Sequence, residues 1–135
     1  NFDLHLTITS FKSNDEKIII NKIKKNIKFL KIFDIETKNF GISKKFFQSI
    51  FLTVKKKKEI TLFKKQIDRI LEINEKRYFP HISLYYGKQT EISKKKIIRK
   101  IKNFNNYLIS IKQVYLVIND EDNLRWKTVK KFNLS

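Results

Sequence analysis

Hydrophobic and polar positions alternate over residues 2–9, which is the pattern of a strand with one buried face. On one side lie Leu4, Leu6 and Ile8, and on the other lie Asp3, His5, Thr7 and Thr9. A run with the pattern of a helix capping box follows at residues 13–16, and large aliphatic residues then recur at helical spacing. The pattern therefore predicts a strand over residues 2–9 and a helix from residue 13 to about residue 33.

The rest of the chain switches between strand and helix periods in the same way. The pattern predicts strands over about 35–42 and 46–54, a helix over about 60–75, a strand over 81–86, a helix over about 91–103, and strands over about 107–118 and 124–132. Pro80 opens the strand at 81–86 and Gly87 closes it, because proline stops a helix and glycine favours a turn. The acidic run at 119–123 is typical of a solvated turn between the last two strands.

The expected elements form a repeat. The first half runs strand, helix, strand, strand, and the second half runs helix, strand, helix, strand, strand. We therefore expect one two-lobed α+β domain over residues 1–135, with two pseudo-twofold-related antiparallel sheets and helices on the outside. The first half has no counterpart to the leading helix of the second half. We accordingly expect that a first strand and helix of the natural protein are missing at the N-terminus.

The composition excludes several kinds of site. The chain has no cysteine, so it can form neither a disulfide nor a thiolate metal site. It has two histidines and no carboxylate cluster beside them, so no metal and no other cofactor is expected. No apolar run reaches the roughly 20 residues that span a bilayer, and no signal peptide is visible. We expect a cytoplasmic monomer with no membrane partner.

The formal net charge of +18 raises the question of a nucleic-acid partner. Alanine is absent and Lys, Ile, Asn and Phe are in excess, which is the composition that an AT-rich genome imposes on any protein. Arginine, which binds phosphate in a bidentate manner, supplies four of the 31 basic residues. Compositional bias is therefore the first explanation of the charge and attraction to anions the second. Either way the charge favours a negatively charged substrate.

The two histidines of the chain share one motif. His5-Leu6-Thr7 and His81-Ile82-Ser83 each consist of a histidine, an aliphatic residue and a hydroxyl residue on an expected strand. Residues i and i+2 of a strand point to the same face, so each motif places an imidazole beside a hydroxyl. If the two halves pack about a pseudo-twofold axis, both imidazoles and both hydroxyls face a common cleft.

These residue types suit in-line displacement at phosphorus. One neutral imidazole can take a proton from the attacking water, and one charged imidazole can give a proton to the departing sugar oxygen. The two hydroxyls can donate hydrogen bonds to the non-bridging phosphate oxygens. We therefore expect His5 and His81 to be catalytic, Thr7 and Ser83 to bind the substrate phosphate, and the reaction to need no metal.

Both motifs resemble the paired signatures of the two-histidine (2H) phosphoesterase superfamily, in residues 4–8 and 80–87. Within it, the chain is most similar to the plant and yeast cyclic phosphodiesterases. Their second motif likewise runs Pro-His-x-Ser-Leu and continues with a Tyr and a small residue. Residues 117–129, with Trp126 followed by Val129, are similar to the terminal hairpin of that family, and residues 46–54 to the strands between its motifs.

The resemblance implies a bilobal fold and hydrolysis of nucleotide cyclic phosphates. The substrates it implies are ADP-ribose 1″,2″-cyclic phosphate and nucleoside 2′,3′-cyclic phosphates. Members of the family carry a strand and a helix before the first motif, which this sequence lacks. Tyr86 stands where such enzymes carry a Tyr that holds substrate or water, but strict alternation would turn it away from His81, so a core role is an equal alternative.

Other interpretations stay open. Within the superfamily, the chain could be an RNA 2′,3′-cyclic phosphodiesterase or RNA-end ligase. Outside it, the basic surface and the aromatic residues would also suit a noncatalytic RNA-binding module, although this leaves the matched histidine motifs without an explanation. Trp126 could stack on a base or pack in the terminal hairpin, and we favour the hairpin core.

Overall fold

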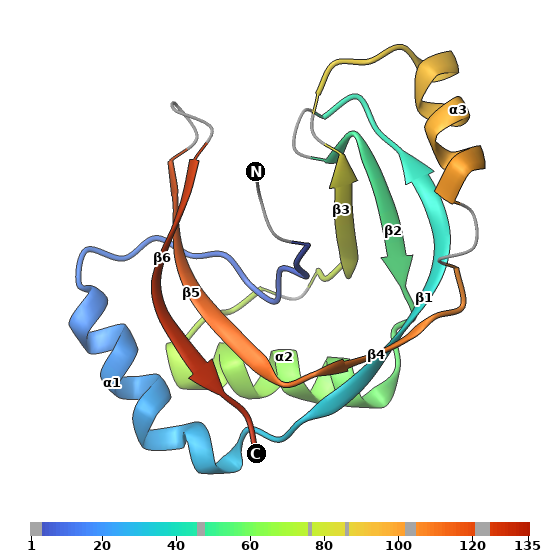
Figure 1. The fold of residues 1–135 in the computed structure, drawn as a ribbon. Coiled ribbons are helices and arrows are strands. Elements are labelled where there is room, and N and C mark those ends of the chain that lie inside the picture. Colours follow the sequence, from blue (N-terminus) through green and yellow to red (C-terminus); the bar gives the residue numbers. More distant parts are fainter. Residues whose placement is uncertain (1–3, 46–47, 76, 86, 102–104, 121–124) are drawn as a thin grey trace.

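Helices and strands alternate along the chain in this computed structural model, which describes residues 4–45, 48–75, 77–85, 87–101, 105–120 and 125–135 (Figure 1). The helices are α1 (Glu16–Asn26), α2 (Lys58–Leu71) and α3 (Glu91–Ile101), with a 3₁₀ turn, η1, at Ile27–Phe29. The strands are β1 (Phe33–Ile42), β2 (Ile50–Val54), β3 (His81–Tyr85), β4 (Leu108–Ile111), β5 (Gln113–Asp120) and β6 (Arg125–Asn133). From α1 onward the predicted order of elements is confirmed, except that one expected strand is divided into β4 and β5, and the fold is α+β.

Two antiparallel sheets of unequal size carry these strands. The larger sheet has the order β3-β2-β1-β4 and curls, and the smaller sheet is the hairpin β5-β6. The strand expected at residues 107–118 is instead broken at Lys112, which is a correction to the sequence prediction. Ile111 still pairs with Phe33 of β1, whereas the carbonyl of Lys112 accepts a hydrogen bond from the Leu134 amide at the end of the hairpin. The segment expected to form one strand thus supplies strands to two sheets.

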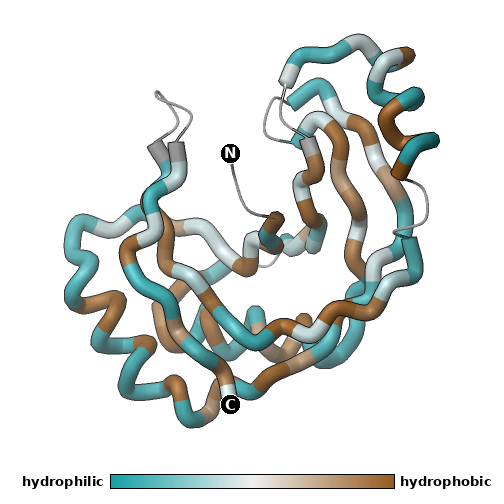
Figure 2. The backbone as a smooth tube through the Cα atoms, viewed as in Figure 1, coloured by the Kyte–Doolittle hydropathy of each residue, from teal (hydrophilic) through white to brown (hydrophobic). Residues whose placement is uncertain are grey.

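Each sheet buries one face against a helix. Ile60, Phe63 and Ile67 of α2 pack onto the larger sheet, where the Phe33 and Phe63 rings lie 4.6 Å apart. Ile19 and Ile23 of α1 pack against the β6 side of the hairpin, and Figure 2 shows the hydrophobic positions recurring along α1 at the helical period. Burial of these apolar side chains is the main term that stabilises the fold. No helix in the described part of the chain is long and apolar enough to cross a bilayer.

Several further boundaries differ from the sequence prediction. The first helix, expected to reach about residue 33, ends at Asn26 and is followed by the turn η1, and β1 already begins at Phe33. α1 begins two residues later than the capping-box pattern indicated, because Asp15 is the N-cap: its carboxylate accepts from the amides of Lys17 and Ile18. The Ser13 hydroxyl oxygen accepts a hydrogen bond from the amide of Asp15, in the segment that precedes the helix. β2 begins at Ile50 rather than at residue 46, and residues 46 and 47 lie outside the described residues.

The expected strand at residues 2–9 is largely absent from its described part. Over residues 4–9 the structure has one isolated bridge, between Leu6 and Ile82, and Leu4 is 67% exposed. The carbonyl of Thr7 accepts a hydrogen bond from the Tyr78 hydroxyl. The Tyr78 side chain thus occupies a carbonyl acceptor that a β-ladder could have used. Alternation of hydrophobic and polar residues was not sufficient here to form a strand.

Candidate functional site

β3 carries the second motif in the larger sheet. It pairs with β2 in the register Thr53↔His81 and Phe51↔Ser83. The middle residue of the motif, Ile82, is buried in the core between this sheet and α2. Because side chains alternate along a strand, His81 and Ser83 lie on the face of β3 that points away from that core. His81 is half-buried and Ser83 is 6% exposed.

The His81 ring is held by contacts from its own neighbourhood. Its Nδ1 lies 2.8 Å from the carbonyl oxygen of Phe79. The Phe79 ring stacks on it with 5.4 Å between centroids, and the Phe51 ring meets it edge-on at 5.7 Å. A carbonyl oxygen can only accept, so Nδ1 carries the hydrogen. The lone pair of a neutral His81 therefore sits on Nε2, as a general base requires.

The first motif lies beside the second. Leu6 pairs with Ile82 in an antiparallel bridge, and both side chains pack into the same core cluster. In antiparallel register, the neighbours of this pair place His5 opposite Ser83 and Thr7 opposite His81. All four residues then lie on the side away from the core. The structure thus places the two motifs side by side.

The first motif also touches the smaller sheet. The His5 and Trp126 rings lie 4.3 Å apart at an interplanar angle of 44°. Residues 5 and 6 therefore join the two sheets, since His5 contacts β6 and Leu6 pairs with β3 (Figure 1). Trp126 is 37% exposed. The expectation that it belongs to the hairpin core is wrong, because its ring packs on a motif residue instead.

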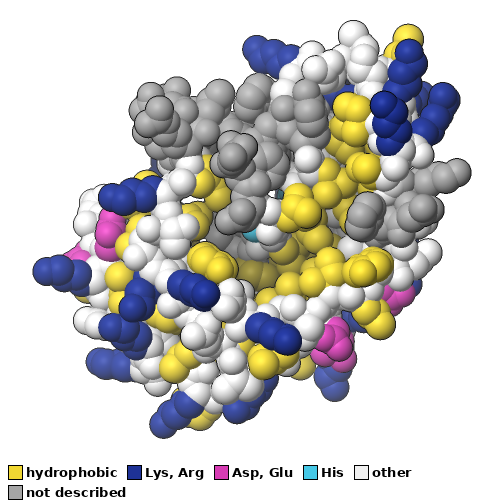
Figure 3. All heavy atoms as spheres, viewed as in Figure 1, with side chains coloured by type: hydrophobic (Ala, Val, Ile, Leu, Met, Phe, Trp, Pro, Cys, Tyr) yellow, Lys and Arg dark blue, Asp and Glu magenta, His cyan; other side chains and the backbone are white. Residues whose placement is uncertain are grey.

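The face that carries the motifs is hollowed. Figure 3 shows hydrophobic side chains lining the hollow, a histidine ring inside it, and lysine and arginine side chains around its margin. Such a surface suits a ligand with an anionic part and an apolar part. In the described residues no three His, Asp or Glu side chains come together as a metal site would require.

Sequence reasoning missed two residues of this site. Phe79 is 52% exposed and stacks on His81. The sequence did contain a signal for this contact, because a residue two positions before a histidine in extended backbone lies on the same face. Tyr78, which donates to the Thr7 carbonyl over 3.0 Å, gave no signal because its partner lies 71 residues away. Tyr86 and the acidic residues at 121 and 122 lie outside the described residues.

Two comparisons with known proteins bear on the site. The family described as cyclic phosphodiesterase-like protein has a sequence model that matches residues 1–134, which is nearly the whole chain. The match includes both histidine motifs. The comparison with curated proteins gave no match.

Proposed function

Because this chain belongs to the cyclic phosphodiesterase-like family and is a cyclic phosphodiesterase, we propose that it hydrolyses nucleotide cyclic phosphates with His5 and His81 as its acid–base pair. The substrates we propose are ADP-ribose 1″,2″-cyclic phosphate and nucleoside 2′,3′-cyclic phosphates. The observation that carries the proposal is the Leu6–Ile82 bridge, which aligns the two motifs side by side. A single histidine near a strand end would carry no such argument.

In the proposed reaction, water attacks phosphorus opposite the sugar oxygen that leaves. A bond forms between phosphorus and the water oxygen, and the bond to the sugar oxygen breaks, leaving a phosphomonoester. His81 takes the water proton on Nε2, because its Nδ1–H is directed at the Phe79 carbonyl. His5 gives its proton to the departing sugar oxygen. Thr7 and Ser83 donate hydrogen bonds to the non-bridging oxygens as charge builds on them.

Two structural features belong to the same proposal. One is the bilobal arrangement of the 2H phosphoesterases, in which pseudo-twofold halves each supply one motif. The two sheets, each with a helix on its buried face, support it, although the sheets differ in strand number. The other feature is independence of metal, which follows from a mechanism in which the leaving oxygen needs only a proton.

The test is a turnover assay on a panel of cyclic phosphates. The panel contains ADP-ribose 1″,2″-cyclic phosphate, the four nucleoside 2′,3′-cyclic phosphates and an RNA oligonucleotide ending in a 2′,3′-cyclic phosphate. We expect turnover of ADP-ribose 1″,2″-cyclic phosphate or of a nucleoside 2′,3′-cyclic phosphate, unchanged by EDTA. His5→Ala and His81→Ala should each lose about a hundredfold or more, as loss of acid–base catalysis typically costs.

Each other outcome has a defined meaning. Turnover of the RNA oligonucleotide alone would place the chain among RNA 2′,3′-cyclic phosphodiesterases. Binding of RNA without turnover of any substrate would indicate a noncatalytic module. Loss of activity on chelation, restored by zinc or manganese, would contradict the metal-independent mechanism.

A further inference from the structure

The first motif makes little backbone pairing with the sheet for a segment proposed to carry catalytic residues. Residues 81–85 lie in a ladder with β2, whereas residues 4–9 meet β3 at the single Leu6↔Ile82 bridge among the described residues. One bridge fixes the position of the backbone, and the orientation of the segment then depends on its other contacts, which include the packing of His5 on Trp126 and of Leu6 in the core. A motif whose imidazole must reach a defined atom needs a second point of attachment.

Tyr78 supplies that second attachment. Its hydroxyl donates to the carbonyl oxygen of Thr7 over 3.0 Å. Tyr78 lies three residues before His81, on the segment that leads into β3. The hydrogen bond therefore joins the same two segments as the Leu6–Ile82 bridge does. These two attachments, at neighbouring residues, act together with the Trp126 contact to orient the first motif.

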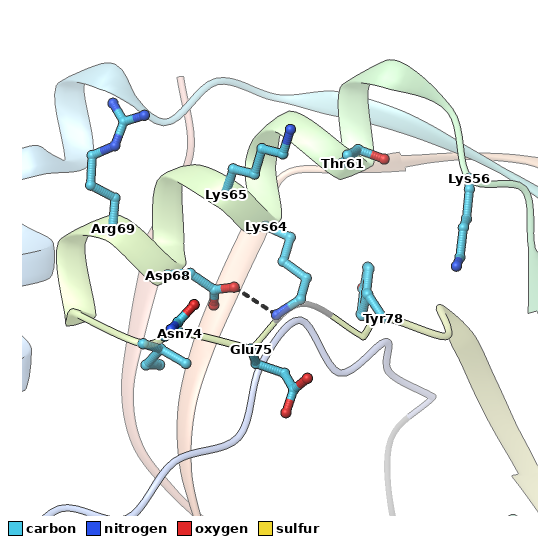
Figure 4. A pocket seen from close by; sticks show the side chains of 10 residues that line it. Lys56, Thr61, Lys64, Lys65, Asp68, Arg69, Asn74, Glu75 and Tyr78 are labelled. Atoms are coloured by element: carbon cyan, nitrogen blue, oxygen red, sulfur yellow. Dashed lines mark hydrogen bonds and ion pairs between the residues drawn. The ribbon is translucent and has the colours of Figure 1, made fainter.

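The Tyr78 ring is held in turn by a buried ion pair on α2. Lys64 Nζ lies 2.8 Å from Asp68 Oδ2, and the two residues are 6% and 8% exposed. The same Nζ lies 5.1 Å from the centroid of the Tyr78 ring, within the range of a cation–π contact. Figure 4 shows all three side chains along one open depression of about 530 Å³ below α2. The ion pair thus connects α2 with the tyrosine.

The Tyr78 hydroxyl stays a donor over the pH range of histidine chemistry. Burial raises its pKa above the usual value of 10, and the negative charge of Asp68 raises it further. A raised pKa favours the protonated hydroxyl of the folded state, so the bond to the Thr7 carbonyl is kept at every pH at which an imidazole changes charge.

We infer that Tyr78 is a positioning residue, whose hydroxyl holds the Thr7 carbonyl and thereby sets the His5 and Thr7 side chains relative to His81. This inference rests on the proposed function of the two motifs. Tyr78 itself touches no reacting atom. It acts through the backbone of the first motif, and Lys64 and Asp68 of α2 support its ring.

The test is Tyr78→Phe, which removes the hydroxyl and keeps the ring over Lys64. The matched control is Tyr115→Phe on β5, where the lost hydroxyl donates to Gln113 Oε1 over 2.9 Å. We expect Tyr78→Phe to lower kcat about tenfold with KM within about twofold, since misplacement of a catalytic group affects the chemical step. Amide exchange over residues 5–8 should accelerate about tenfold. Tyr115→Phe should change neither, at a similar thermal midpoint.

The outcomes separate this inference from the function on which it rests. If His5→Ala and Thr7→Ala lower turnover and Tyr78→Phe does not, the positioning role is wrong and the proposed function stands. Faster exchange with unchanged kcat would make the hydrogen bond merely structural, which also overturns the inference. If His5→Ala leaves turnover intact, both proposals fail, and exchange in Tyr78→Phe still reports whether the hydroxyl holds the segment.

Discussion

The two histidine motifs have nearly the same sequence and are held in different ways. His81 is positioned by the Phe79 carbonyl two residues earlier and by the regular ladder between β3 and β2. His5 is positioned from far away, by a bridge to Ile82, by the Trp126 ring and, through Thr7, by Tyr78. The second motif is thus part of a sheet, and the first is docked onto it.

This difference bears on how an acid–base pair can divide its work. A base that must align a water benefits from a rigid frame, and β3 provides one. A docked segment depends on every long-range contact that holds it. Substitutions distant from the reacting atoms should therefore disturb the position of His5 more than the position of His81.

The largest expected effect separates the chemical roles of the two histidines. A cyclic phosphate analogue with an unusually good leaving group needs no acid, so it should restore much of the turnover of His5→Ala and little of that of His81→Ala. The pH profile of the wild-type rate should be bell-shaped, with the rate falling on both sides of its maximum. Steady-state rates of the two variants on both substrates check which histidine is the acid and which is the base. Rescue of His81→Ala instead would exchange the two roles, and rescue of neither would mean that the histidines act together in another way.

The next effect compares the two hydroxyls. Ser83 is 6% exposed within the β3 ladder, whereas Thr7 is exposed on the docked segment. A preorganised donor contributes more to transition-state stabilisation, so Ser83→Ala should lower kcat by about a hundredfold and Thr7→Ala by about tenfold. Ser83→Thr and Thr7→Ser, which keep the hydroxyls, are the matched controls. Equal losses would mean that the two segments are equally rigid.

A smaller effect is expected from the aromatic residues beside the histidines. Trp126→Ala removes the ring 4.3 Å from His5 and should lower kcat roughly fivefold. Phe79→Ala should lower it by about twofold, because the backbone carbonyl and the Phe51 ring still hold His81. Turnover of both variants on one substrate measures the contrast. A larger loss for Phe79→Ala would show that His81 depends on its stacked ring more than on its backbone contact.

The smallest effect concerns the sheet that carries His81. Glu36 of β1 contacts Lys55 at 2.6 Å and Lys57 at 2.7 Å, and its hydrogen bonds with Lys55 and then Lys57 lower the pKa of its carboxyl below the usual 4.5. Because the pKa of Glu36 is lowered in the folded state, its ionised carboxyl stabilises the fold at pH values above 4.5. This contribution is lost as the pH falls through the pKa of the folded state. Relative to Glu36→Gln, the wild type should have a slightly higher thermal midpoint at pH 7.

The Glu36 advantage should disappear in strong acid, which thermal unfolding of both proteins from pH 7 down to pH 2 would measure. Turnover of Glu36→Gln at pH 7 should match the wild type, because the ladder of β3 does not depend on this ion pair. A loss of turnover would show that the framework of His81 is less rigid than its ladder implies.

Much of this molecule could be predicted from local pattern. Helical spacing located α1, α2 and α3, because a period reports which side of a helix is buried, and short runs of apolar residues between turn signals located β1, β2, β3 and β6. The motif pairing was predictable in the same way, since a shared pattern of histidine, aliphatic residue and hydroxyl on two strands is visible in the chain itself. The repeat also indicated that the two motifs belong together.

Tertiary structure decided how the first motif is held and how the sheets divide. The break at Lys112 divides one expected strand between two sheets, the Tyr78 hydroxyl reaches a carbonyl 71 residues away, and Trp126 leaves the hairpin core for His5. A hydrophobic period is a property of neighbouring residues and carries no information on partners. Which distant groups meet depends on how whole elements pack and on which hydrogen bonds that packing leaves to be made.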